Sequence, residues 1–109
     1  MTDDVLQRLA ALVRSRRAES AANSYTRQLI DAGPERCAQK LGEEATETVI
    51  AALGADTGAL RREAADLLYH LLVLLECRQV AWEEVLAELE SRMGTSGLVE
   101  KASRPRHGP

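Results

Sequence analysis

Two pairs of acidic residues share one spacing in neighbouring parts of the sequence. The members of each pair are three positions apart: Glu44 with Glu47, and Glu63 with Asp66. On an α-helix this spacing places two side chains on one face, about one turn apart. A single pair of this kind is common on solvated helix faces, where Lys40, Arg61 or Arg62 could balance the charge. Whether the acids form a functional site therefore depends on whether the two pairs lie close together in the fold.

A short turn between the pairs would bring them together. The segment GADTG, residues 54–58, has the composition of a turn and separates helices predicted at about 34–53 and 59–77. With a rise of about 1.5 Å per residue, pairs lying roughly 9 to 12 residues before the turn and 7 to 10 after it reach similar heights. Four carboxylates then converge on antiparallel helices. Geometry alone leaves both a metal site and solvated helix faces open.

The chemistry of such a cluster follows from its ligand atoms. Carboxylates buried together without partners would cost several kcal/mol, whereas a divalent cation relieves their repulsion. Oxygen ligands without His or Cys favour Mg²⁺, with Mn²⁺ as a substitute, and argue against zinc. Magnesium shares its coordination with water and phosphate oxygens, so the implied reaction is hydrolysis of a phosphoanhydride.

The composition predicts an all-α protein. The chain has 109 residues, of which 45% are hydrophobic and only 3% aromatic, with no Phe. This length suits one domain, and a core of Leu, Val, Ile and Ala favours helices packed on helices. The net charge of −3 argues against a nucleic-acid partner. It does not argue against an anionic substrate, because bound cations invert the local charge.

Cysteine usage and hydropathy predict a cytoplasmic protein with no membrane partner. Cys37 and Cys77 belong to no Cys-x-x-Cys pair and are expected as reduced, buried small side chains. The most apolar run, residues 67–75, is too short to cross a bilayer. The first ten residues are acidic and amphipathic, unlike a signal peptide.

Four to five helices must position the acids. Besides the two long ones, the apolar spacing predicts a first helix capped by Thr2, a short helix from Ser24 to Ala32, and a last helix at about 81–92. Residues 14–25 are predicted as a loop, and Ala81 is a poor cap for the last helix. The predicted organisation is a helical domain over residues 1–94 and a basic C-terminal tail over 95–109, mobile at its end.

The second long helix is more apolar than one chain can accommodate. Its second half is apolar around almost the whole circumference, through Leu67, Leu68 and the run from Leu71 to Leu75. Such a helix must be buried on several sides. A homodimer with this helix at or near the interface is the simplest arrangement that buries it.

The acidic pattern resembles that of the MazG-type all-α nucleotide pyrophosphohydrolases. Within that group, four stretches between residues 24 and 104 resemble the phosphoribosyl-ATP pyrophosphohydrolase family: SYTRQL, GPERCAQKLGEEATETVIAA, EAADLLYHLLVLL and SGLVEKASR. The resemblance implies a MazG-like helical bundle of four to five helices, with its core completed by dimerisation. It also implies Mg²⁺-dependent hydrolysis of phosphoribosyl-ATP to phosphoribosyl-AMP and pyrophosphate, the second step of histidine biosynthesis.

The resemblance assigns roles to individual acids. It implies that the metal ligands are Glu44, Glu47, Glu63 and Asp66. Glu43 and Glu47 are the candidate catalytic residues. Glu43, one turn before Glu47, would be a further ligand or the base that polarises the attacking water, or else a solvated acid.

The same resemblance suggests substrate contacts. Lys40 shares the face of Glu44 and would contact a phosphate or pair with that carboxylate. Tyr25 would shape the substrate pocket or anchor the core. Lys101 and Arg104 would close over anionic groups, or belong to an irregular terminus. His70 is expected to be a partly buried histidine with satisfied polar groups.

Two other functions remain open at this point. A MazG-type house-cleaning pyrophosphatase acting on non-canonical or deoxynucleoside triphosphates would share the ligands but lack the SYT and EKASR motifs. A non-catalytic helical oligomerisation module would use its acids only for solvation.

Overall fold

The computed structural model describes residues 4–93, and the part of the chain that it describes contains helices and no strand. The elements are α1 (Val5–Ser15), the 3₁₀-helix η1 (Arg16–Ala18), α2 (Tyr25–Ala32), α3 (Pro34–Ala52), α4 (Thr57–Cys77) and α5 (Trp82–Arg92). The all-α prediction is confirmed. None of these helices combines the length and hydrophobicity needed to span a bilayer. The predicted tail, with Lys101 and Arg104, lies outside the described residues.

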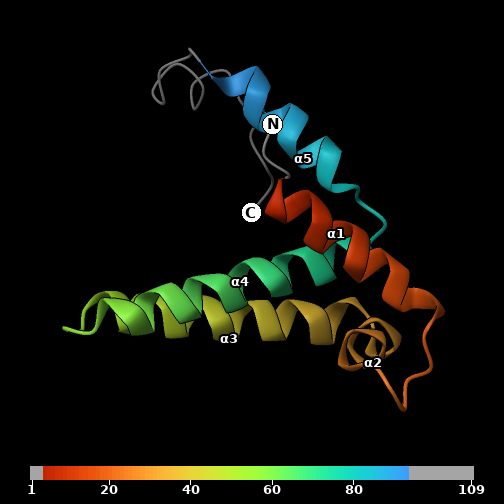
Figure 1. Cartoon of the computed structure of the whole chain (residues 1–109), viewed down its shortest axis with the longest axis horizontal. Helices are drawn as coiled ribbons and strands as arrows, with labels where there is room; N and C mark the ends of the chain where they lie inside the picture. Colours follow the sequence, from red (N-terminus) through yellow and green to blue (C-terminus); the bar gives the residue numbers. More distant parts are fainter. Residues whose placement is uncertain (1–3, 94–109) are drawn as a thin grey trace, which may run out of the picture.

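Helices α3 and α4 form an antiparallel hairpin that dominates the molecule (Figure 1). Gly33, with a φ of 96°, separates α2 from α3, and Pro34 occupies the first position of α3, where its missing N–H costs nothing. At the far end of the hairpin, Asp56 caps α4 by accepting a hydrogen bond from the Gly58 N–H at 2.9 Å. The predicted reversal between the two acidic pairs is confirmed.

The core lies at the end of the hairpin opposite this turn. There α1 crosses α4, and α2 packs against both α3 and α4 (Figure 1). The buried apolar side chains are Val13, Leu29, Cys37, Leu72, Val73 and Trp82. Both thiols are free and lie near consecutive α2 carbonyls: Cys37 Sγ is 3.1 Å from Leu29 O, and Cys77 Sγ is 4.0 Å from Ile30 O.

The start of the chain differs from the prediction. Asp4, not Thr2, caps α1: its carboxylate accepts from the N–H groups of Leu6 at 2.9 Å and Gln7 at 3.4 Å. Part of the predicted loop is helical, because α1 continues to Ser15 and η1 follows. Arg17 in η1 then donates to both the carboxylate and the main-chain carbonyl of Glu76, near the C-terminus of α4. This contact holds the connection between α1 and α2 against the hairpin.

Helix α5 extends away from the hairpin (Figure 1), and its first half packs against the core. Ala81 has no capping oxygen, but its N–H donates to the Glu84 carboxylate at 2.8 Å, which is half of a capping box. Trp82 is buried, whereas Leu89 and Met93 near the other end of α5 are exposed. The helix is therefore attached to the core through its first half, with Trp82 as its one fully buried residue.

Candidate active site

Three of the predicted ligands converge across the α3–α4 hairpin. Glu44 from α3 and Glu63 and Asp66 from α4 each offer a carboxylate oxygen, and these oxygens lie within 4.8 Å of one another. The antiparallel arrangement of the helices brings the two acidic pairs to the same height, as the rise per residue requires. Glu44 and Glu63 are partly buried and Asp66 is exposed, so the cluster opens to solvent on one side. An oxygen-only set of this size suits a small, hard cation.

The cluster is electrostatically unfavourable without a cation. Partial burial raises the pKa of Glu63 above its ordinary value, and the neighbouring charges of Glu47, Asp66 and Glu44 raise it further, while Arg62 partly offsets them. A divalent cation placed among these oxygens would reverse that balance. The repulsion is therefore of the kind that a bound cation relieves.

Glu47 lies at the edge of this set. It is exposed, one turn after Glu44 on α3, and its oxygens are not among those that converge within 4.8 Å. Its charge nevertheless acts on Glu63, as the raised pKa of that carboxyl indicates. The side chain is close enough to contribute to the electrostatics of the cluster from the solvent side.

Lys40 pairs with Glu43 and not, as one alternative had it, with Glu44. Its Nζ donates to Glu43 Oε1 at 3.2 Å, and Gln39 Nε2 donates to the other oxygen of Glu43 at 3.3 Å. The hydrogen bond from Lys40 lowers the pKa of Glu43, and the same bond raises the pKa of Lys40. Glu43 is thus outside the converging set and ionised at neutral pH.

Tyr25 and His70 extend the site toward α2. The imidazole of His70 is buried, with its Nε2 3.9 Å from Glu44 Oε1. It meets the rings of Tyr69 at 4.9 Å and Tyr25 at 6.3 Å, both edge-on. Burial first, and then the charge of Lys40, lower the pKa of His70, so it is neutral at neutral pH.

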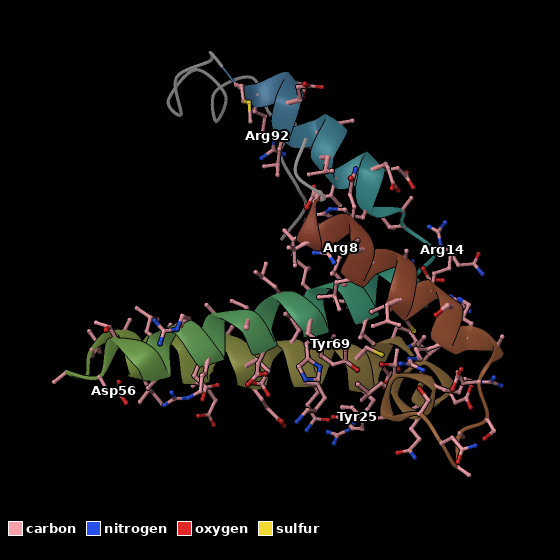
Figure 2. The ribbon with its side chains drawn as sticks, in the orientation of Figure 1. Arg8, Arg14, Tyr25, Asp56, Tyr69 and Arg92 are labelled. Carbon is pink, nitrogen blue, oxygen red and sulfur yellow. The ribbon has the colours of Figure 1, made fainter. Side chains whose placement is uncertain are left out.

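Tyr25 is not a core residue. Its side chain is 51% exposed at the start of α2. Tyr25 and Tyr69 lie at the α2 end of the hairpin, whereas Asp56 marks the opposite end (Figure 2). Ser24 is buried and caps α2, accepting from the Arg27 N–H at 3.1 Å. The Thr26 hydroxyl is hydrogen-bonded to the Tyr69 hydroxyl at 2.5 Å. Because the polar groups of Ser24 and Thr26 are thus engaged within the protein, Tyr25 is the residue of the SYT motif that can contact a substrate.

One residue at the site was not predicted. The hydroxyl of Thr48 lies between the main-chain carbonyl oxygens of Glu44, at 2.8 Å, and Glu63, at 3.2 Å. The sequence gives one indication of this role: Thr48 directly follows Glu47, on the side of α3 that faces α4.

Comparison with known proteins gives one consistent result. The sequence model described as phosphoribosyl-ATP pyrophosphohydrolase matches residues 6–93. A curated "Phosphoribosyl-ATP pyrophosphatase" of Jannaschia sp. is 54% identical over 99 residues, covering 91% of this chain and 97% of the relative. Its counterpart in Dinoroseobacter shibae is 54% identical, covering 92% and 98%. "Phosphoribosyl-ATP pyrophosphatase 1" of Rhodopseudomonas palustris is 55% identical, covering 93% and 94%.

Proposed function

Because the chain belongs to the phosphoribosyl-ATP pyrophosphohydrolase family, it is a hydrolase of the triphosphate in phosphoribosyl-ATP, and we propose that Glu44, Glu47, Glu63 and Asp66 hold Mg²⁺ for this reaction. The products are phosphoribosyl-AMP and pyrophosphate, at the second step of histidine biosynthesis. The observation that carries the metal proposal is the convergence of carboxylates from two helices within 4.8 Å.

The donor set fits magnesium better than a softer metal. It consists of carboxylates, and the imidazole of His70 lies outside it, with its Nε2 3.9 Å from Glu44 Oε1. The four carboxylates would hold the ion, and Mg²⁺, or Mn²⁺ in its place, would supply charge neutralisation for the phosphate groups. The exposed acids Asp66 and Glu47 face the side from which a triphosphate would approach, while Glu44 and Glu63 anchor the site from its partly buried side.

We assign the role of general base to the carboxylate oxygen of Glu47 that a bound cation would leave free, and a supporting role to Glu43. Glu43 is hydrogen-bonded to Lys40, which lowers its pKa and so weakens it as a proton acceptor. Glu47 is exposed beside the cluster, where a water attacking the triphosphate would have to lie. Glu43 would then hold Lys40 in place to contact a phosphate.

The substrate contacts are proposed on the same face. Lys40 and Tyr25 are close enough for the tyrosine to influence the pKa of the lysine, and both lie beside His70 at the α2 end of the site. Lys40 would bind a phosphate, and the exposed ring of Tyr25 offers a flat apolar surface to a base or ribose. Lys101 and Arg104, outside the described residues, are proposed to close over the anionic groups.

Substrate and metal are tested together by a panel of nucleotides. We expect kcat/KM for phosphoribosyl-ATP to exceed that for any of the four deoxynucleoside triphosphates by about 10²-fold or more, because the second ribosyl phosphate adds contacts. Chelation should abolish pyrophosphate release, and Mg²⁺ or Mn²⁺ should restore it. Equal turnover of all nucleotides would support the house-cleaning alternative. Activity that resists chelation would contradict the metal site, and no hydrolysis at all would favour the oligomerisation module.

We also propose a homodimer. On the hairpin, apolar side chains remain exposed: Val49 at 61%, Ile50 at 63%, Leu53 at 86% and Leu68 at 38%. Exposed apolar side chains on two adjacent helices are typical of an interface. A second copy of the hairpin would cover them. The free thiols of Cys37 and Cys77 support the further proposal of a cytoplasmic location.

Sedimentation equilibrium tests the dimer. At micromolar concentration we expect twice the chain mass of 11.9 kDa. Ile50→Lys places a charge in the proposed interface and should shift the equilibrium to monomer, because burying an unpaired charge costs several kcal/mol. Ala22→Lys, in the exposed connection before α2, is the control and should leave the mass unchanged. A monomeric wild-type protein would contradict the proposal.

A further inference from the structure

Thr48 links the main chains of two proposed ligand residues. Its hydroxyl is in hydrogen-bond range of the Glu44 carbonyl at 2.8 Å, one turn back in α3, and of the Glu63 carbonyl at 3.2 Å, across the hairpin in α4. The bond within α3 is one that any helical threonine can make. The contact with α4 is specific to this fold, because it requires that the two helices lie close together at this turn. The side chain is partly buried between them.

This part of the hairpin is held together by side chains that are at most partly buried. Among residues 38–69, no side chain is fully buried, and the buried core lies beyond, at Cys37 in α3 and at His70, Leu72 and Val73 in α4. The carboxylates at this level also repel one another, because their oxygens lie within 4.8 Å of one another. The Thr48 hydroxyl, which shares its one proton between the two carbonyls, therefore links the helices where no side chain is fully buried and the carboxylates repel one another.

The position of the bond fits the needs of a cation site. Magnesium requires near-octahedral oxygens at about 2.0–2.1 Å, so its ligands must be held within about 0.5 Å of the working geometry. Ligands on two different helices keep that geometry only if the helices keep their separation and register. The carbonyls that Thr48 contacts belong to Glu44 and Glu63, the partly buried ligand on each helix.

We propose that Thr48 is a positioning residue of the metal site, whose hydroxyl fixes the approach of α3 to α4 where the ligands meet. The inference rests on the proposed function, since it presupposes that the carboxylates bind a cation. Thr48 touches neither substrate nor metal in this role. It lowers the free energy needed to bring together carboxylates whose mutual repulsion would otherwise separate the helices.

Matched variants of the full-length protein separate this role from ordinary packing. Thr48→Val keeps the shape but loses the hydroxyl, and Thr48→Ser keeps the hydroxyl. Thr46→Val is the control, because Thr46 donates to the Gly42 carbonyl at 3.1 Å within α3 and is exposed. The Kd for Mg²⁺ alone is measured by isothermal titration calorimetry, beside kcat and KM at several Mg²⁺ concentrations.

We expect Thr48→Val to weaken Mg²⁺ binding about 10- to 100-fold, the range typical of residues that orient metal ligands. Its kcat should recover at saturating Mg²⁺. Thr48→Ser and Thr46→Val should bind Mg²⁺ within about threefold of wild type. If Thr48→Val does not fold, Thr48→Ala supplies the same loss of the hydroxyl with a smaller side chain.

The outcomes also separate this inference from the metal proposal. A Thr48→Val or Thr48→Ala protein that binds Mg²⁺ as wild type does, with only a lower melting temperature, would overturn the positioning role and leave the metal site intact. A wild-type protein that does not bind Mg²⁺, or binds it equally well after Glu44→Gln, would overturn both.

Discussion

Glu63→Gln should remove activity and at the same time raise the melting temperature of the metal-free protein. Partial burial and the charges of Glu47, Asp66 and Glu44 raise the pKa of Glu63, so the folded chain disfavours its ionised form. Glutamine removes that charge with almost no change in shape. It also removes an anionic ligand, and because metal charge stabilisation amounts to several kcal/mol, kcat should fall on the order of 10³-fold.

The stabilisation should depend on pH in one direction. Since the folded-state pKa of Glu63 lies above its unfolded value, the destabilising charge is fully present above the folded-state pKa and absent below the unfolded one. The melting temperatures of variant and wild type should therefore differ at pH 7 and converge as the pH falls toward about 4. Mg²⁺ should reverse the order, because at a hundredfold excess over Kd it stabilises a binding protein by about 2.7 kcal/mol.

Thermal melts in EDTA and in Mg²⁺, with a pyrophosphate-release assay, check this prediction. Glu90→Gln is the matched control, an exposed glutamate on α5, and should change neither activity nor the response to Mg²⁺. A Glu63→Gln protein that melts below wild type in EDTA would show that the carboxylate makes stabilising contacts, and the cluster would then not be a site held under repulsion.

The sequence was enough to predict the hairpin and the meeting of three of its four paired acids. Helical rise is fixed, and the turn between the pairs is short, so the heights of Glu44 and Glu63 follow from residue counting alone. The long helices lie within two residues of their predicted bounds. The N-cap of α1 was harder to predict, because Thr2 and Asp4 are both good capping residues. Only the packing of the helix decides at which of them it begins.

The individual side-chain partners could not be predicted in the same way. Lys40 can reach an acid three or four positions ahead, and both spacings are allowed, so its choice of Glu43 depends on rotamers. The contact of Arg17 with Glu76 spans 59 positions and depends on how α1 crosses α4. The role of Thr48 depends on the rotation of α3 about its axis, which a periodic pattern defines only to within a broad face.

Trp82→Ala should destabilise the protein more than any substitution at the site. Trp82 is 7% exposed and packs in the core with Val13, Leu29, Leu72 and Val73. Removing a buried tryptophan costs about 3–5 kcal/mol, a large share of the 5–15 kcal/mol typical of a folded domain. The loss should be near the upper end, because Trp82 is the one fully buried side chain of α5.

Thermal and urea unfolding at one fixed protein concentration measure this loss, which should lower the melting temperature by about 12 °C or more. Trp82→Phe should cost only about 1 kcal/mol, since it keeps a large ring and deletes an indole N–H that finds no hydrogen-bond partner among residues 4–93. Glu83→Ala, exposed in the same turn, is the control and should stay within about 0.5 kcal/mol of wild type.

The Mg²⁺ affinity of Trp82→Ala at low temperature then separates the metal site from the core. The proposed ligands lie near the middle of the hairpin, between residues 44 and 66, whereas Trp82 belongs to the core cluster at the start of α5. A folded Trp82→Ala protein should therefore bind Mg²⁺ with the wild-type Kd, although it unfolds at a lower temperature. A weakened Kd in the folded variant would mean that the core, and not the contact of Thr48 across the hairpin, sets the spacing of the carboxylates.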